Sequence, residues 1–221
     1  MEGLLPPGEM DRLVEVTRAA GGVVNERTLS DGTRRPYELA VTWADVLGHG
    51  VPADDAMHRH LSSRALALAL RGVPLLYLGS LVAAANDTDR YARTGHGRDL
   101  DHRRWQAGGL DDLLGTPGSR ESAALAGISA MLQVRRQYAA FAPHAGQVAH
   151  GEHPALVVVE RVPADGCRAV VAVNVSADPV PLELPAGHWV RIDAGADLAG
   201  SAAVVGDPLE AWGNAWFVEL R

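Results

Sequence analysis

The chain has 221 residues and a formal net charge of −7, with 47% hydrophobic and 21% charged residues. This composition is typical of a globular protein and excludes disordered, collagen-like and coiled-coil chains, while the acidic charge excludes a basic surface for nucleic acid or anionic lipid. All 20 basic residues are arginine, so chemistry that depends on a lysine side chain, such as a Schiff base or a P-loop, is excluded.

Apolar residues at helical spacing predict three helices, near residues 7–20, 54–71 and 119–138. A turn is expected at Asp31-Gly32. It is followed by a short extended run at Tyr37–Trp43. These elements indicate a mixed α/β organisation in the first two thirds of the chain.

The segment Val73–Leu78 reads VPLLYL and is apolar without alternation, which is typical of a strand buried on both faces of a parallel sheet. Such a strand needs neighbours on both edges, and Tyr37–Trp43 supplies at most one. The first 146 residues therefore resemble part of a sheet whose other strands are absent. We expect the apolar faces of Val73–Leu78 and of helices 54–71 and 119–138 to be exposed.

From residue 147 the chain consists of short β-type runs between turns, which predicts a small antiparallel β-sandwich domain at 147–221. The runs are Ala155–Val162, Arg168–Val175, Val180–Leu184, His188–Ile192 and Asn214–Leu220. Residues 79–117 are a long polar stretch, and loops of this length are usually functional or disordered.

One cysteine, Cys167, is present, so no internal disulfide can form and a reducing compartment is favoured. The N-terminal MEGLLPPGEMDR lacks the basic start and long apolar run of a signal peptide. No apolar stretch is long enough to span a bilayer. We therefore expect a cytoplasmic protein.

The stretch Gly72–Trp105 carries three recognisable marks: GVP-x-x-Y at its start, Asn86-Asp87, and a T-x-x-GRD pattern that ends at Asp99. It resembles the last barrel strand and following loop of the alpha-amylase superfamily, glycoside hydrolase family 13, in its sucrose phosphorylase-like branch. PYELAVTWADVL upstream and AWGNAWFVEL at the C-terminus are similar to further segments of that branch.

The resemblance implies a C-terminal fragment of a (β/α)8 TIM barrel, comprising its last strand and helices at residues 1–146 with an insertion at 1–52. A C-terminal β-domain follows at 147–221. It also implies a retaining glucosyl phosphorylase or transferase that works with a sugar substrate and inorganic phosphate. Neither a cofactor nor a metal is expected.

Family members use a carboxylate nucleophile, a carboxylic acid and a third, stabilising carboxylate. The resemblance places all three upstream of this sequence, so we expect the chain to be inactive alone and to need a complementing N-terminal fragment. Met1 is then either a mispredicted start or the start of a truncated gene. A non-catalytic sugar-binding or interaction protein derived from the same family is the alternative.

Four substrate-binding residues follow from the resemblance. Arg98 of the GRD pattern is expected in the glucosyl subsite, where a rigid fork of donors suits a hydroxyl-rich ligand. Arg35, Tyr37 and Glu38 match a loop that lines the acceptor and phosphate side. Because sucrose phosphorylases carry Asp and Gln in place of Arg35 and Glu38, the acceptor stays open among fructose, fructose phosphate, glycerol and glycerate. An arginine there favours a phosphorylated or carboxylated acceptor.

Other polar residues are given structural interpretations. Asn86-Asp87 is expected to shape its loop through side-chain-to-backbone bonds. His58 and His60 have a spacing that places them on different helix faces, which argues against a metal site. An acid/base set of Asp87, Asp99 and His102 is conceivable, although no pairing among them is indicated.

Overall fold

The computed structural model describes residues 5–151, 153–192 and 207–220. It forms two compact units, residues 1–56 with 77–122 (unit 1) and residues 57–76 with 123–221 (unit 2). No helix in these described ranges is both long and apolar enough to cross a membrane.

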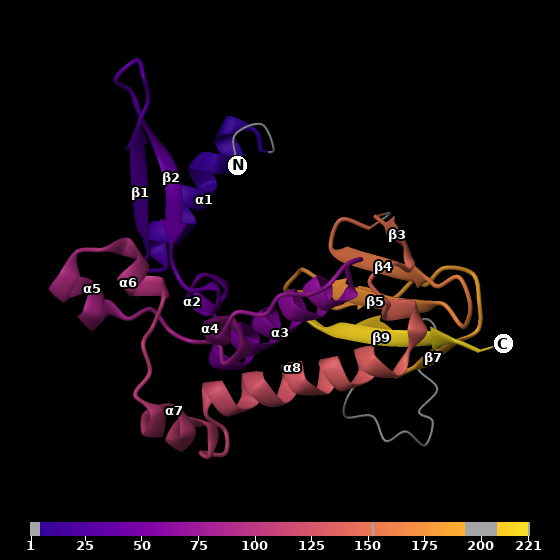
Figure 1. The fold of residues 1–221 in the computed structure, drawn as a ribbon. Helices are drawn as coiled ribbons and strands as arrows, with labels where there is room; N and C mark the ends of the chain where they lie inside the picture. The colour runs from indigo at the N-terminus through magenta and orange to yellow at the C-terminus, as the bar shows by residue number, and fades with distance from the viewer. Residues whose placement is uncertain (1–4, 152, 193–206, 221) are drawn as a thin grey trace. The chain divides into compact units, whose positions relative to one another are not determined.

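Unit 1 begins with helix α1 (Pro7–Ala19), which lies beside a hairpin of strands β1 (Val23–Thr28) and β2 (Arg34–Ala40) (Figure 1). Proline at the first helical turn loses no intrahelical hydrogen bond. After the helix, Gly21 adopts a left-handed φ of +74°. A Cβ at Gly22 would lie 2.7 Å from the Thr17 and Val41 side chains, so only glycine permits this close approach of helix and hairpin.

The hairpin pairs Val23 with Ala40 and Thr28 with Arg34 in antiparallel register. Its turn is closed by hydrogen bonds from Leu29 N to Thr33 O (2.8 Å) and from Gly32 N to Leu29 O (3.0 Å), so the turn expected at Asp31-Gly32 is confirmed. The register shifts between Asn25 and Glu26, which leaves Tyr37 as an extra residue in β2. The expected extended run at 37–43 is thus displaced to 34–40.

Strand β2 stops at Ala40 because helix α2 (Trp43–Gly48) begins soon after it. The Thr42 hydroxyl caps this helix by accepting from Asp45 N at 3.3 Å. The long polar stretch around residues 79–117 forms four short helices. They are α4 (Leu78–Leu81), α5 (Thr88–Thr94), α6 (Gly97–Asp101) and α7 (Ala107–Leu114).

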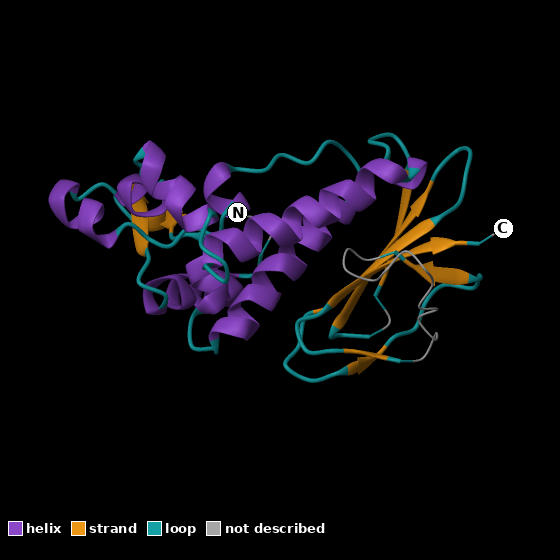
Figure 2. Cartoon of the chain, turned by 90° about the horizontal axis from the view of Figure 1, so that it is seen from below, coloured by secondary structure: helices purple, strands orange, loops and turns teal. Residues whose placement is uncertain are grey.

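Unit 2 contains most of helices α3 (Ala53–Ala69) and α8 (Arg120–Gln137), which run side by side (Figure 2). A Cβ at Gly127 of α8 would lie 2.7 Å from a Leu61 methyl of α3, so the helices are in direct contact. Both helices were expected, but exposure of their apolar faces was wrong. Leu68 of α3 and Ile128 of α8 are fully buried.

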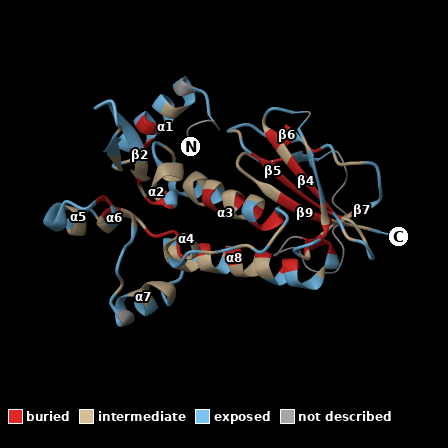
Figure 3. Ribbon diagram, turned by 45° about the horizontal axis from the view of Figure 1, so that its top comes forward, coloured by how far each residue is buried: buried red, intermediate tan, exposed pale blue. Residues whose placement is uncertain are grey.

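A five-stranded antiparallel sheet forms the rest of unit 2, in the order β3-β4-β5-β9-β7. The central strands are the most buried part of the unit (Figure 3), and Trp216 packs against Phe141 with ring centroids 5.1 Å apart. The strands are β3 (Gly146–His150), β4 (Leu156–Val162), β5 (Ala169–Asn174), β7 (Trp189–Arg191) and β9 (Asn214–Glu219), and a two-stranded ladder pairs β6 (Val180–Pro181) with β8 (Pro208–Leu209).

The expected buried strand at Val73–Leu78 is not observed. Residues 73–77 have no regular secondary structure and pair with no described strand, and α4 begins at Leu78. Val73 is 81% exposed and Leu75 96% exposed. The described chain supplies neither the neighbouring strands nor cover for these side chains.

Candidate functional site

Glu38 of β2 and Arg98 of α6 come together in unit 1, although 60 residues separate them. Arg98 Nε donates to Glu38 Oε1 at 3.3 Å, and the Asn25 amide of β1 donates to Glu38 Oε2 at 3.2 Å. The Arg98 side chain is 71% exposed and that of Glu38 30% exposed. The two sequence-predicted residues therefore form one polar cluster, with Asn25 as a third member.

Helix α6 is held rigidly against the hairpin at the residue before Arg98. A Cβ at Gly97 would lie 2.6 Å from Asn25 Nδ2 and 3.2 Å from Ala40 Cβ, so a larger residue here would displace the Asn25 side chain. On the other side of Arg98, Asp99 accepts from Arg90 Nε of α5 at 2.6 Å. The backbone that carries Arg98 is thus fixed from both neighbours.

Asp99 is an ionised structural carboxylate. A hydrogen bond from the Thr94 side chain lowers its pKa most, and hydrogen bonding and charge from Arg90 lower it further. Its carboxylate therefore joins α5 to α6 and is not available as a proton donor at neutral pH.

Asn86 ties three parts of unit 1 together. Its Oδ1 accepts from Thr42 N at 2.8 Å and its Nδ2 donates to Ala20 O at 3.2 Å, while its own N donates to Asp45 Oδ2 at 2.7 Å. Asp87 caps α5 by accepting from Arg90 N at 3.0 Å. The loop-shaping role expected for Asn86-Asp87 is therefore confirmed.

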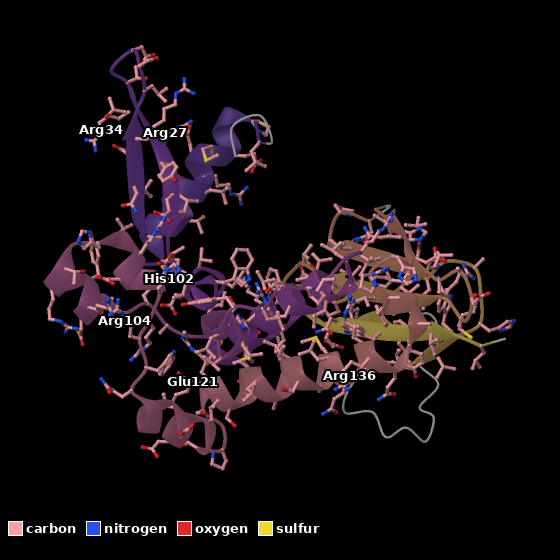
Figure 4. All side chains as sticks on the ribbon, in the orientation of Figure 1. Arg27, Arg34, His102, Arg104, Glu121 and Arg136 are labelled. Atoms are coloured by element: carbon pink, nitrogen blue, oxygen red, sulfur yellow. The ribbon has the colours of Figure 1, made fainter. Side chains whose placement is uncertain are left out.

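The other two predicted residues, Arg35 and Tyr37, lie on the same strand as Glu38. Tyr37 is the extra residue at the bulge and is 61% exposed. Arg35 lies directly opposite Arg27 in the hairpin register, and Thr28 lies opposite Arg34. Figure 4 shows Arg27 and Arg34 toward the turn end of the hairpin, which therefore carries three arginines within two cross-strand pairs.

The conceivable acid/base set does not assemble, because its members have other partners. Asp99 is bonded to Arg90, and His102 Nδ1 lies 2.7 Å from Asp101 Oδ1. The His102 ring packs against Tyr77, with centroids 5.5 Å apart. His58 is exposed and His60 buried, as their spacing predicted. Within the described residues, no cluster of three or more His, Cys, Asp or Glu side chains could hold a metal ion.

Sequence reasoning missed Asn25 and the tight contact at Gly97. The signal for β1 was present, since VVNERT lies between Gly21-Gly22 and an Asp-Gly turn, the usual frame of a hairpin strand. The contact between β1 and α6 has no sequence signal, because the two segments are about 70 residues apart and meet only in the folded unit.

Comparison with known proteins adds to this geometry. No protein-family profile matches the chain. It is 26% identical over 219 residues to the glucosylglycerate phosphorylase of Escherichia coli K12, covering 98% of this chain and 38% of that protein. It is 32% identical over 196 residues to the glucosylglycerate phosphorylase of Allomeiothermus silvanus, covering 85% and 35%.

Among solved structures, the alpha-glucosyl transfer enzyme XgtA has a similar fold, with a TM-score of 0.56 and 21% identity over 80% of this chain and 38% of that chain. The chain thus spans little more than a third of the length of these relatives. Sequence and fold together define the class: this chain corresponds to a C-terminal part of a glycoside hydrolase family 13 enzyme. Within that family its relatives are glucosyl phosphorylases, so the resemblance stated from the motifs is confirmed.

Proposed function

We propose that this chain is the C-terminal part of a retaining glucosyl phosphorylase whose acceptor carries an acidic group, and that the chain is inactive by itself. The observation that carries this proposal is its similarity to glucosylglycerate phosphorylases over nearly its whole length. In the complete enzyme, phosphate releases the acceptor from a glucoside and forms glucose 1-phosphate.

The segment 73–77, which joins no described sheet, supports the finer proposal that residues 1–146 are part of a (β/α)8 barrel. Every strand of such a barrel pairs on both edges and is surrounded by helices. Here the segment follows α3 and precedes α4, and its apolar side chains are exposed. We assign residues 1–52 to an insertion and 147–221 to the C-terminal β-domain. The chain's partner is then the portion of the barrel that completes the sheet.

Inactivity of the chain follows from the chemistry of the class. A retaining enzyme needs two carboxyl groups about 5 Å apart, one as nucleophile and one as acid and then base. The resemblance places these groups in the part of the relatives that this chain does not span. The carboxylates of unit 1 that lie nearest Arg98, Glu38 and Asp99, are occupied by Asn25 and by arginines.

The turn end of the hairpin supports an acidic acceptor. Arg27 and Arg35 occupy directly opposite positions near the turn of the hairpin. A carboxylate or phosphate bound beside them would accept charge-assisted hydrogen bonds from two guanidinium groups. We therefore place Arg35 and Tyr37 on the acceptor side and Arg98 in the glucosyl subsite.

The first test is an assay of the chain alone and of the chain joined to the preceding portion of the Allomeiothermus silvanus enzyme. With glucosylglycerate and phosphate, we expect glucose 1-phosphate from the joined enzyme and none from the chain alone. Turnover by the chain alone that survives repurification contradicts the proposal. A folded joined enzyme that binds the glucoside without turnover favours the non-catalytic alternative.

The second test addresses the acceptor. In the joined enzyme, Arg35→Gln should lower kcat/KM for glycerate more than for glycerol in the synthetic direction. The matched control is Arg34→Gln, because Arg34 is 70% exposed and already pairs with Glu26 at 3.2 Å. Equal effects of the two substitutions contradict the placement of Arg35.

A further inference from the structure

The Arg98 guanidinium is bonded on one side only. Its Nε donates to Glu38 Oε1, whereas neither of its Nη groups has a hydrogen-bond partner among the described residues. An arginine held at Nε presents its two Nη groups as an open fork, which suits a pair of adjacent oxygen atoms. The direction of that fork depends on where Glu38 holds the Nε.

Glu38 is itself fixed by a contact that does not involve Arg98. Its second oxygen accepts from the Asn25 amide at 3.2 Å, and the same Asn25 side chain abuts Gly97, the residue before Arg98. Asn25, Glu38, Gly97 and Arg98 therefore form a closed set of contacts across β1, β2 and α6. This arrangement can aim a flexible side chain before any ligand binds.

We propose that Glu38 is a positioning residue that orients Arg98, and that it does not contact the acceptor itself. The inference rests on the proposed function for the reaction, but the contact itself is a property of this chain. An exposed ion pair contributes little to stability, so removal of Glu38 should leave the fold intact and change the direction of the Arg98 fork. Its loss should then act on glucosyl transfer to every acceptor alike.

The chain contains a closely matched control. Glu26 accepts from Arg34 Nε at 3.2 Å on the same hairpin, with exposures of 70% for Arg34 and 30% for Glu26 that nearly equal those of the Arg98–Glu38 pair. Removal of Glu26 deletes the same charge and the same type of bond. It leaves Arg98 untouched.

The first measurement uses NMR on this chain with Leu75→Asp added to limit self-association. Glu38→Ala should shift the Arg98 Nε–Hε signal and leave that of Arg34 in place, and Glu26→Ala should do the reverse. An Arg98 signal that is unmoved by Glu38→Ala overturns the inference. This readout is independent of enzymatic activity, so it decides the inference even if the joined enzyme proves not to be a phosphorylase.

The second measurement is a double-mutant cycle in the joined enzyme. Glu38→Ala should lower kcat/KM by about threefold to tenfold, equally for glycerate, glycerol and fructose, and should have almost no effect once Arg98 is already alanine. Glu38→Gln, which still accepts from Nε, should recover part of the loss. Additive effects, or a changed ranking of acceptors with Glu38→Ala, would show that Glu38 contacts the acceptor and would overturn the inference.

Discussion

At the scale of single residues, Arg98 is the side chain on which the proposed chemistry depends most. The active sites of (β/α)8 barrels form at the C-terminal ends of the strands, and the loop that carries Arg98 follows the segment we assign to a barrel strand. Its backbone is fixed by Gly97 and Asp99, and its Nη groups face no described protein partner. These features suit a side chain that binds the glucosyl group, which is transferred whichever acceptor is used.

We therefore expect Arg98→Ala in the joined enzyme to lower kcat/KM by roughly tenfold to a hundredfold. The reason is that the bound sugar would lose a charged hydrogen-bond donor, at a cost of about 1–3 kcal/mol. The loss should be similar for glycerate, glycerol and fructose when measured in the synthetic direction. A reordering of the acceptors with unchanged glucosyl transfer to phosphate would place Arg98 on the acceptor side.

Asp99 gives unit 1 a pH dependence in the acid range. Its folded-state pKa is lowered by Thr94 and then by Arg90, so its contribution to stability is present above the ordinary Asp value of 3.8 and is lost as the pH falls through the lower folded value. The difference in urea unfolding between the natural chain and Asp99→Asn should be clear at pH 6 and shrink below pH 3.8. A constant Asp99→Asn difference across this range contradicts the assignment.

At the scale of elements, two buried arginines hold the C-terminal end of α3. Arg135 donates to Leu68 O and, at 3.1 Å, to Gly72 O. Arg161, which is fully buried, donates to Ala69 O and Ala142 O, each at 2.9 Å. Cations are stabilising at a helix C-terminus, where the last carbonyls have no intrahelical donor. Burial, followed by repulsion from Arg135 and Arg71, lowers the pKa of Arg161.

Replacement of Arg161 by methionine should destabilise unit 2 by about 3 kcal/mol, because several buried carbonyls would lose their donor at roughly 1–3 kcal/mol each. Urea unfolding followed by tryptophan fluorescence measures this loss. Arg136→Met, at an exposed position next to Arg135, should change stability by less than about 0.5 kcal/mol. Equal effects of the two substitutions would mean that the carbonyl contacts of Arg161 contribute nothing.

At the scale of the whole molecule, exposed apolar side chains are concentrated at the segment after α3. Leu70 is 45%, Val73 81%, Leu75 96% and Leu78 50% exposed, and residues 73–77 have no described strand partner. A segment that joins no sheet and exposes apolar side chains favours association with other chains.

We therefore expect the isolated chain to self-associate, and Leu75→Asp to shift it toward the monomer without changing its far-ultraviolet circular dichroism. Sedimentation velocity across a concentration series measures the shift. Leu220→Asp removes another exposed leucine, far along the sequence, and should leave the association unchanged. A natural chain that is monodisperse and melts cooperatively contradicts the expectation.

Several elements could be predicted from the sequence because their signals are local. Helical spacing predicted α1, α3 and α8, and β-type runs between turns predicted β4, β5 and β9. The motif order predicted the family, and the relatives confirm it. The GRD pattern also selected Arg98, and the segment around Tyr37 selected Glu38, the residue that Arg98 contacts.

Tertiary structure alone decided the rest, because those features depend on contacts between distant segments. Asn25 joins Glu38 only through hairpin pairing, and Gly97 matters only because α6 packs on that hairpin. The apolar pattern of 73–78 predicted a buried strand, but whether a strand forms depends on backbone partners, and residues 73–77 pair with no described strand. A local pattern specifies which surface must be covered, whereas only the folded arrangement supplies the segments that cover it.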